Sequence, residues 1–173
     1  TTMSALRLIN ETEITSSVSS VDITDVFSAD FDIYKVTTDN MISASGTPAL
    51  DLKYLNSSGS AISSGYDKAL YTLKGEATFS ENRGTNLSNI ASGLSNAESN
   101  SAGSVSYLFN PFSSSSYTFH IMQGSFKASG NFRNQKMISV LKNVASVTGL
   151  NITFNGGNCT GGTIRVFGLR VDS

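Results

Sequence analysis

The stretch from Val105 to Met122, VSYLFNPFSSSSYTFHIM, is the part of the sequence that decides the fold. Its two ends, Val105–Phe109 and Tyr117–Met122, are rich in aromatic and β-branched residues, which favour strands. They flank a polar connection, Asn110–Ser116, in which Pro111 has no backbone N–H to donate to a strand ladder. The stretch therefore predicts a β-hairpin whose connection is exposed and tolerant of substitution.

Outward from this hairpin, short strand-like segments recur along the whole chain, separated by turns rich in Gly, Ser and Asn. About ten such strands predict one all-β domain over residues 1–173, an antiparallel, jelly-roll-like β-sandwich with little helix. The other predicted strands are Ala5–Ile9, Val18–Val26, Phe31–Thr37, Ala49–Leu55, Tyr66–Leu73 with a partner near Ala77–Phe79, Met137–Leu141, Gly149–Phe154 and Thr163–Val171.

Residues 82–102 do not follow the strand pattern. Leu87, Ile90 and Leu94 have helical spacing, but Gly93 and the many Ser and Asn residues around it weaken a helix. We expect a long loop here, with a weak strand or a single helical turn.

The closing segment changes its alternation at Gly168. Ile164 and Val166 have one parity, and Leu169 and Val171 have the other. A bulge or bend at the glycine would let all four apolar side chains reach the core. We then expect two basic side chains to face solvent or a neighbouring subunit: Arg165 and Arg170.

Composition excludes several classes of function. Lys and Arg number 12 and Asp and Glu 13, and this net charge of −1 gives no general attraction to nucleic acid or to an anionic membrane. The single Cys and single His exclude an intrachain disulfide and a Cys/His zinc cage within one subunit. No apolar run approaches the ~20 residues of a membrane span, and no signal peptide is visible. Met3 before Ser4 resembles a native start, which would make Thr1 and Thr2 an addition.

Charge is distributed unevenly along the chain. Up to Asp51 there are eight acids and two bases, and from His120 onward there are six bases and one acid. The two halves either neutralise each other within the fold or allow head-to-tail assembly through opposite patches.

The sequence offers few candidates for chemistry, and we expect neither an enzyme nor a cofactor. His120 lies in an alternating strand and Cys159 in a Gly-rich turn, and both are interpreted as structural. The acids Asp22, Asp25, Asp30 and Asp32 lack EF-hand spacing. Turn and cap chemistry is the simpler interpretation of these four, and a cation site near them stays open.

The hairpin connection supplies the candidate binding residues. Phe112 follows Pro111 in a polar loop, and an exposed aromatic there can stack on a sugar ring. Packing of the aromatics in the core or at its rim is the alternative. The candidate surface-binding loop comprises Asn110, Pro111, Phe112 and Tyr117.

Three short stretches resemble parts of a known class of proteins. They are LRLINE at Leu6–Glu11, LFNPFSS at Leu108–Ser114 and GTIRVFGLR at Gly162–Arg170. Together, and in this order, they resemble small β-rich virion proteins of marine tailed bacteriophages. The resemblance implies a jelly-roll-like subunit on the tail, the tail fibre or the head surface, as a capsid decoration. It assigns no catalytic residues.

We therefore expect a structural virion protein that is made in the host cytoplasm and acts by assembly. Its partners would be other virion proteins and further copies of itself, with a trimer as the expected oligomer. No nucleic acid partner and no membrane span are expected. The alternative is a receptor- or glycan-binding module that attaches to the host surface.

Overall fold

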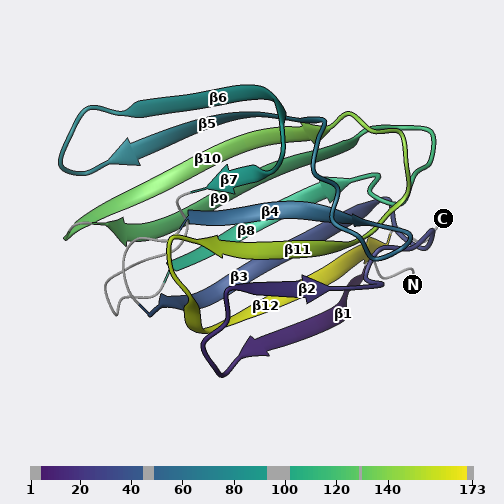
Figure 1. Cartoon of the computed structure of the whole chain (residues 1–173), viewed down its shortest axis with the longest axis horizontal. Coiled ribbons are helices and arrows are strands. Elements are labelled where there is room, and N and C mark those ends of the chain that lie inside the picture. The colour runs from purple at the N-terminus through teal and green to yellow at the C-terminus, as the bar shows by residue number, and fades with distance from the viewer. Residues whose placement is uncertain (1–4, 45–48, 93–101, 129, 171–173) are drawn as a thin grey trace.

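The chain folds as an antiparallel β-sandwich. A computed structural model describes residues 5–44, 49–92, 102–128 and 130–170, and these residues form twelve strands and no helix (Figure 1). The strands make two antiparallel sheets, one of eight strands and one of four. The predicted fold class is confirmed, with twelve strands in place of about ten.

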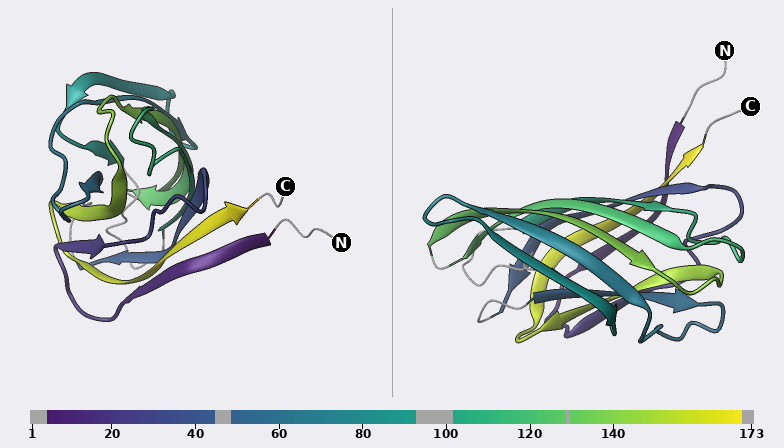
Figure 2. Two further views of the ribbon diagram at one scale, coloured as in Figure 1. Left: turned by 90° about the vertical axis from the view of Figure 1, so that its right-hand side faces the viewer. Right: turned by 90° about the horizontal axis from the view of Figure 1, so that it is seen from above.

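The larger sheet contains the predicted hairpin near its centre, and its strand order is β1-β12-β3-β8-β9-β10-β5-β6. These strands are β1 (Ala5–Ile14), β12 (Cys159–Arg170), β3 (Ile33–Ser43), β8 (Ala102–Phe109), β9 (Thr118–Ala128), β10 (Asn131–Leu141), β5 (Tyr66–Lys74) and β6 (Ser80–Leu87). The smaller sheet has the order β2 (Ser20–Ile23), β11 (Val147–Asn155), β4 (Ala49–Asn56) and β7 (Ile90–Ser92). The chain passes repeatedly from one sheet to the other, as in jelly-roll sandwiches (Figure 2).

The core lies between the two sheets. The smaller sheet contributes Ile23, Leu150 and Ile152, and the larger sheet contributes Ile164 and Val166, all almost completely buried. Full burial of each such side chain stabilises the fold by ~1.5–3 kcal/mol. The two sheets therefore depend on each other for their stability.

Buried tyrosines fix two of the connections around this core. The Tyr66 hydroxyl accepts a hydrogen bond from the Tyr54 backbone N–H (2.9 Å) and donates one to the Ile62 carbonyl (3.0 Å). The Tyr34 hydroxyl likewise accepts from the Ser28 N–H (2.8 Å) and donates to the Ser28 carbonyl (3.0 Å). The Tyr66 hydroxyl thus links β4 to the loop that follows it, and the Tyr34 hydroxyl holds the loop at Ser28 against β3.

The first and last described strands are neighbours. β1 forms one edge of the larger sheet and pairs along its length with β12, from Ala5 opposite Arg170 to Ile14 opposite Gly162. Figure 2 shows the paired ends of β1 and β12 projecting together from the body of the sandwich. β12 also pairs with β3 on its other side, so it is an interior strand.

The expectation of a long loop over residues 82–102 is wrong at residues 82–87, whereas the weak strand expected within it is present at residues 90–92. Residues 80–87 form the edge strand β6, which pairs with β5, and residues 90–92 form β7. An edge strand with largely exposed side chains needs no apolar alternation, so a polar sequence conceals it. Residues 93–101 lie outside the described residues.

The predicted bend at Gly168 is also wrong. β12 pairs with β3 without interruption from Thr163 to Leu169, so Leu169 points away from the buried Ile164 and Val166. The glycine is needed for a different reason, because a Cβ at this position would lie 2.6 Å from the ring of Phe31. Val171 and the side chain of Arg170 lie outside the described residues, whereas Arg165 points away from the core as expected.

We expect Gly168→Ala to destabilise the protein by about 1–3 kcal/mol, the usual cost of overpacking a close contact. Gly75→Ala is the matched control, because a Cβ there would meet only the Phe132 carbonyl at 3.7 Å, an ordinary contact. Urea unfolding of the two variants and the parent measures the difference. Equal stabilities for Gly168→Ala and Gly75→Ala would show that Phe31 does not pack over the glycine.

Candidate interaction surface

The outer face of the larger sheet, on the side away from the smaller sheet, carries three rows of side chains. We call these rows together the outer face. Each row follows the register from strand to strand. The first row is Leu6, Leu169, Ile33, Phe109, Phe119, Val140 and Asp67; the second is Leu8, Phe167, Lys35, Tyr107, Ile121, Ile138, Ala69 and Arg83; the third is Glu11, Arg165, Thr37, Val105, Gln123, Lys136, Tyr71 and Glu81.

The middle row is apolar and exposed at its centre. Tyr107, Ile121 and Ile138 on β8, β9 and β10 are 36%, 44% and 61% exposed. Phe119 in the first row and Tyr71 in the third are exposed as well. Single exposed apolar side chains are common, whereas contiguous apolar patches larger than a few hundred Å² are rare on monomeric soluble proteins.

The inner face of the same strands carries polar as well as apolar side chains. On β9 and β10, Thr118, His120 and Ser139 point into the sandwich and are buried, whereas Ile121 and Ile138 point outward. Met122 and Met137 also point into the sandwich, so the middle of the larger sheet carries apolar side chains on both of its faces.

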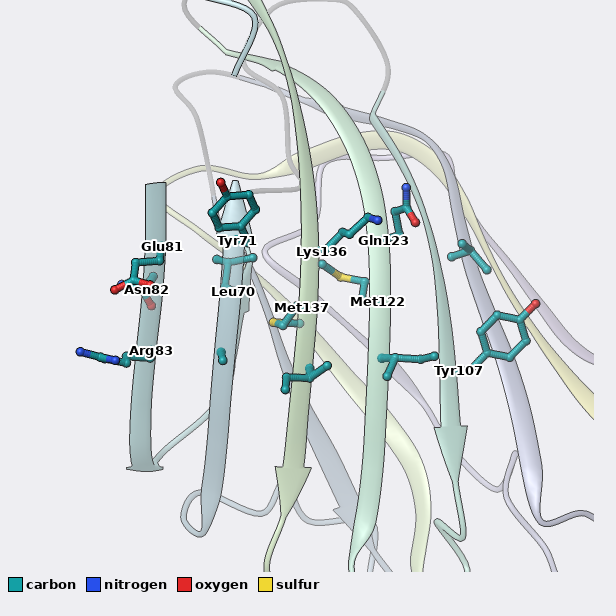
Figure 3. Close-up of a pocket in the computed structure, with 14 residues that line it drawn as sticks. Leu70, Tyr71, Glu81, Asn82, Arg83, Tyr107, Met122, Gln123, Lys136 and Met137 are labelled. Atoms are coloured by element: carbon teal, nitrogen blue, oxygen red, sulfur yellow. The ribbon is translucent and has the colours of Figure 1, made fainter. Parts of the chain in front are cut away.

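Two shallow grooves cross the outer face. One, of about 580 Å³, is lined by Tyr71, Tyr107, Gln123 and Lys136, which come from four neighbouring strands (Figure 3). The other, of about 790 Å³, is lined by Phe119, Ile121, Ile138 and Val140 around the small side chain of Ala69. The first groove combines aromatic rings with amide and ammonium groups, and the second is mainly apolar.

Charges of both signs lie toward the two ends of the rows. At the β1–β12 end, Arg165 Nε donates to Glu11 Oε2 at 2.6 Å, and the Lys35 ammonium lies 5.9 Å from the centre of the Phe167 ring. At the β6 end, Arg83 and Glu81 lie on successive rows of the edge strand. The outer face thus has an apolar centre with mixed charges at its margins.

The predicted surface-binding loop is less exposed than expected. Asn110 donates its N–H to the Asp32 carbonyl (2.7 Å), and Pro111 is buried and accepts from the Val147 N–H (2.8 Å). Phe112 is partly buried and packs against the core. Only Tyr117 of these four residues is exposed, and its ring lies 6.5 Å from that of Phe119. Tyr117 therefore extends the outer face, while the other three close one end of the sandwich.

We expect Phe112→Ala to lower the free energy of unfolding by roughly 1–3 kcal/mol, less than for a fully buried Phe because the ring is only partly covered. Such a loss would contradict the expectation that this loop tolerates substitution at Phe112. Tyr117→Ala in the same connection is the control and should change stability by less than about 1 kcal/mol. Urea unfolding measures both, and a neutral Phe112→Ala would restore the interpretation of an exposed loop.

His120 and Cys159 are both buried, as their structural interpretation requires. His120 Nδ1 lies 3.0 Å from Ser139 Oγ, and burial lowers the pKa of the imidazole to about 4. A cavity of about 30 Å³ between the sheets is lined in part by His120. Burial raises the pKa of the Cys159 thiol, whose Sγ donates to the Gly161 carbonyl at 3.2 Å. Both groups are therefore neutral near pH 7.

Two of the four acids considered for a cation site, Asp22 and Asp30, make side-chain hydrogen bonds. Asp22 accepts a hydrogen bond from Asn151 Nδ2 (2.6 Å), and Asp30 interacts with Ser28 at 3.2 Å. Asp25 has a left-handed backbone, with φ of 55°. Within the described residues, no three His, Cys, Asp or Glu side chains gather in a way that could hold a metal ion.

Comparison with known proteins adds no family. No model of a known protein family matches this chain, and no curated protein matches its sequence. Among the described residues, no helix is long and apolar enough to cross a membrane. The sequence analysis did not identify the outer face, although Phe119 and Ile121 alternate with Thr118 and His120 and so carried the signal.

Proposed function

We propose that this chain is a structural subunit that acts by assembly. The observation that carries the proposal is the outer face, with Tyr107, Ile121 and Ile138 exposed together at its centre. Monomeric soluble proteins rarely expose contiguous apolar patches larger than a few hundred Å². The neutral imidazole and thiol inside the core, and the lack of any acid cluster suited to a metal in the described residues, favour a surface function over catalysis.

The setting we propose is the virion of a tailed bacteriophage, on its tail, tail fibre or head surface. This rests on the resemblance of three motifs, and each motif has a structural place in the fold. LRLINE lies in β1, GTIRVFGLR lies in β12 beside it, and LFNPFSS joins β8 to the loop that closes the sandwich. The motifs thus describe how the sandwich is built and contain no site for chemistry.

Imaging tests this proposal. Gold-labelled antibodies against the purified chain should bind to tails or heads of particles produced from the genome that encodes it. Particles from a deletion of the gene should lack the label and should show an altered or missing component. Labelling confined to soluble protein, with intact particles after deletion, would overturn the proposal.

A second function, binding of a host-surface glycan, is favoured by the groove of about 580 Å³. Tyr71 and Tyr107 offer rings for stacking on sugars, and Gln123 and Lys136 between them offer hydrogen-bond donors. A glycan array tests this function. Binding by the parent that is lost in both Tyr71→Ala and Tyr107→Ala would support it, and an array without specific binding would exclude the glycans tested.

A further inference from the structure

We infer that the outer face is covered by the outer face of a second copy of this chain. The inference rests on the proposed function, because it names the partner through which the subunit assembles. Beyond the proposed function, we infer that the two copies meet face to face through the middle of their larger sheets.

The size of the outer face supports a folded protein as the partner. Seven of the eight strands, from β1 to β5 in the sheet order, contribute apolar side chains to the three rows. With strands ~4.8 Å apart and rows ~6.8 Å apart, these strands and rows span about 34 Å by 20 Å, or about 700 Å². A stable protein interface covers about 800 Å² on each partner. A sugar or a short peptide would leave much of such a face uncovered.

The charges on the outer face allow it to meet a copy of itself. Its cations are Lys35, Arg83, Lys136 and Arg165, and its anions are Asp67, Glu81 and Glu11. Because the two signs are nearly balanced and occur together at each end, two such faces do not repel each other as a whole. A strongly basic face would have indicated a nucleic acid or an anionic membrane instead.

The shape of the outer face, with a projection beside a groove, is also suited to self-association. The most exposed large apolar side chain of the middle row is Ile138, and its neighbour on β5 in the same row is Ala69, the smallest side chain there. The groove of about 790 Å³ lies around this Ala69. Isologous interfaces require projections and hollows on one and the same patch, because each copy supplies both.

Sedimentation velocity of the full chain over a range of concentrations tests the inference. The parent should sediment as a dimer of the 18.3 kDa chain, in place of the trimer expected from the sequence. Ile138→Lys places a charge at the centre of the contact in both copies, and we expect the dimer dissociation constant to rise at least about 100-fold. Because the Ile138 side chain points away from the core, this variant should keep the circular dichroism and urea unfolding of the monomer.

Val144→Lys is the matched control. Val144 is also β-branched and 53% exposed, but it lies between β10 and β11, off the outer face. It should dimerise like the parent. Ile121→Lys, on the neighbouring strand β9, repeats the test if Ile138→Lys fails to fold.

The outcomes separate the inference from the proposed function. An oligomer that persists unchanged in both Ile138→Lys and Ile121→Lys would overturn the inference and leave assembly through another surface. A parent that stays monomeric at all concentrations would also overturn it, and particle labelling would then decide the proposed function by itself. Protection of the outer face by a glycan in a monomer would overturn it in favour of the glycan-binding function.

Discussion

A chain that ends at Gly162 should fail to fold. The truncation removes most of β12, which lies between β1 and β3 and is hydrogen-bonded to both. It also removes the completely buried Ile164 and Val166, worth ~1.5–3 kcal/mol each, and leaves β1 without its only neighbour among the described strands. Domains are stable by only ~5–15 kcal/mol in total, so a loss on this scale abolishes the folded state.

Circular dichroism and urea unfolding of the truncated chain measure this loss. Two point variants of β12 separate the contributions of its two faces to stability, because neighbouring side chains on a strand point to opposite faces. Ile164→Ala should cost about 2–5 kcal/mol, as for other buried Ile residues. Arg165→Ala removes the exposed ion pair with Glu11 and should cost less than about 1 kcal/mol. A truncated chain that is soluble and unfolds cooperatively would show that β12 is an assembly arm and is dispensable for the core.

The second large effect is a loss of stability in mild acid that arises from His120. In the unfolded chain this imidazole has its ordinary pKa of 6.5, whereas burial lowers the pKa to about 4 in the folded protein. Between these values the unfolded state binds a proton that the folded state does not, so stability falls as the pH is lowered from 6.5 to about 4. The full loss is roughly 3 kcal/mol, and above pH 6.5 this contribution to stability is complete.

The chain contains a single His, so no second imidazole contributes to the pH dependence of stability. Urea unfolding from pH 7 to pH 4.5 gives the slope for the parent, and His120→Gln gives the slope without the imidazole. Carboxyl groups such as Asp67, whose pKa is lowered mainly by the Asn86 N–H, contribute equally to both proteins and cancel in the difference. The imidazole resonance should remain that of the neutral form at pH 5. An imidazole that titrates near pH 6.5 in the folded protein would contradict the buried placement.

The sequence predicted the fold class and the central hairpin, because those depend on local alternation and turn chemistry. It did not predict which side of the central strands faces the core. On β9 the apolar residues Phe119 and Ile121 point outward, and Thr118 and His120 point inward. The rule that apolar side chains are buried therefore does not tell the two faces of this strand apart, because both faces carry apolar residues.

Two further errors have a common physical origin in contacts between distant residues. The sequence predicted a bend at Gly168. A glycine is needed there because the ring of Phe31 lies so close to the backbone of β12 that a Cβ would clash with it. Phe112 looked exposed because its neighbours in sequence are polar, yet it packs against the core and its carbonyl accepts from Ser146 Oγ at 2.9 Å. Neither contact leaves a trace in the local sequence, since each partner lies on another element.

The pairing of β1 with β12 also determines how this sandwich can be joined to a larger body. Since Ala5 lies opposite Arg170, the polypeptide enters and leaves the fold at one corner. Domains with adjacent ends can be inserted into a loop of a host protein without stretching it. A protein fused at either end would therefore be attached at the same corner of the sandwich and would leave the rest of its surface free.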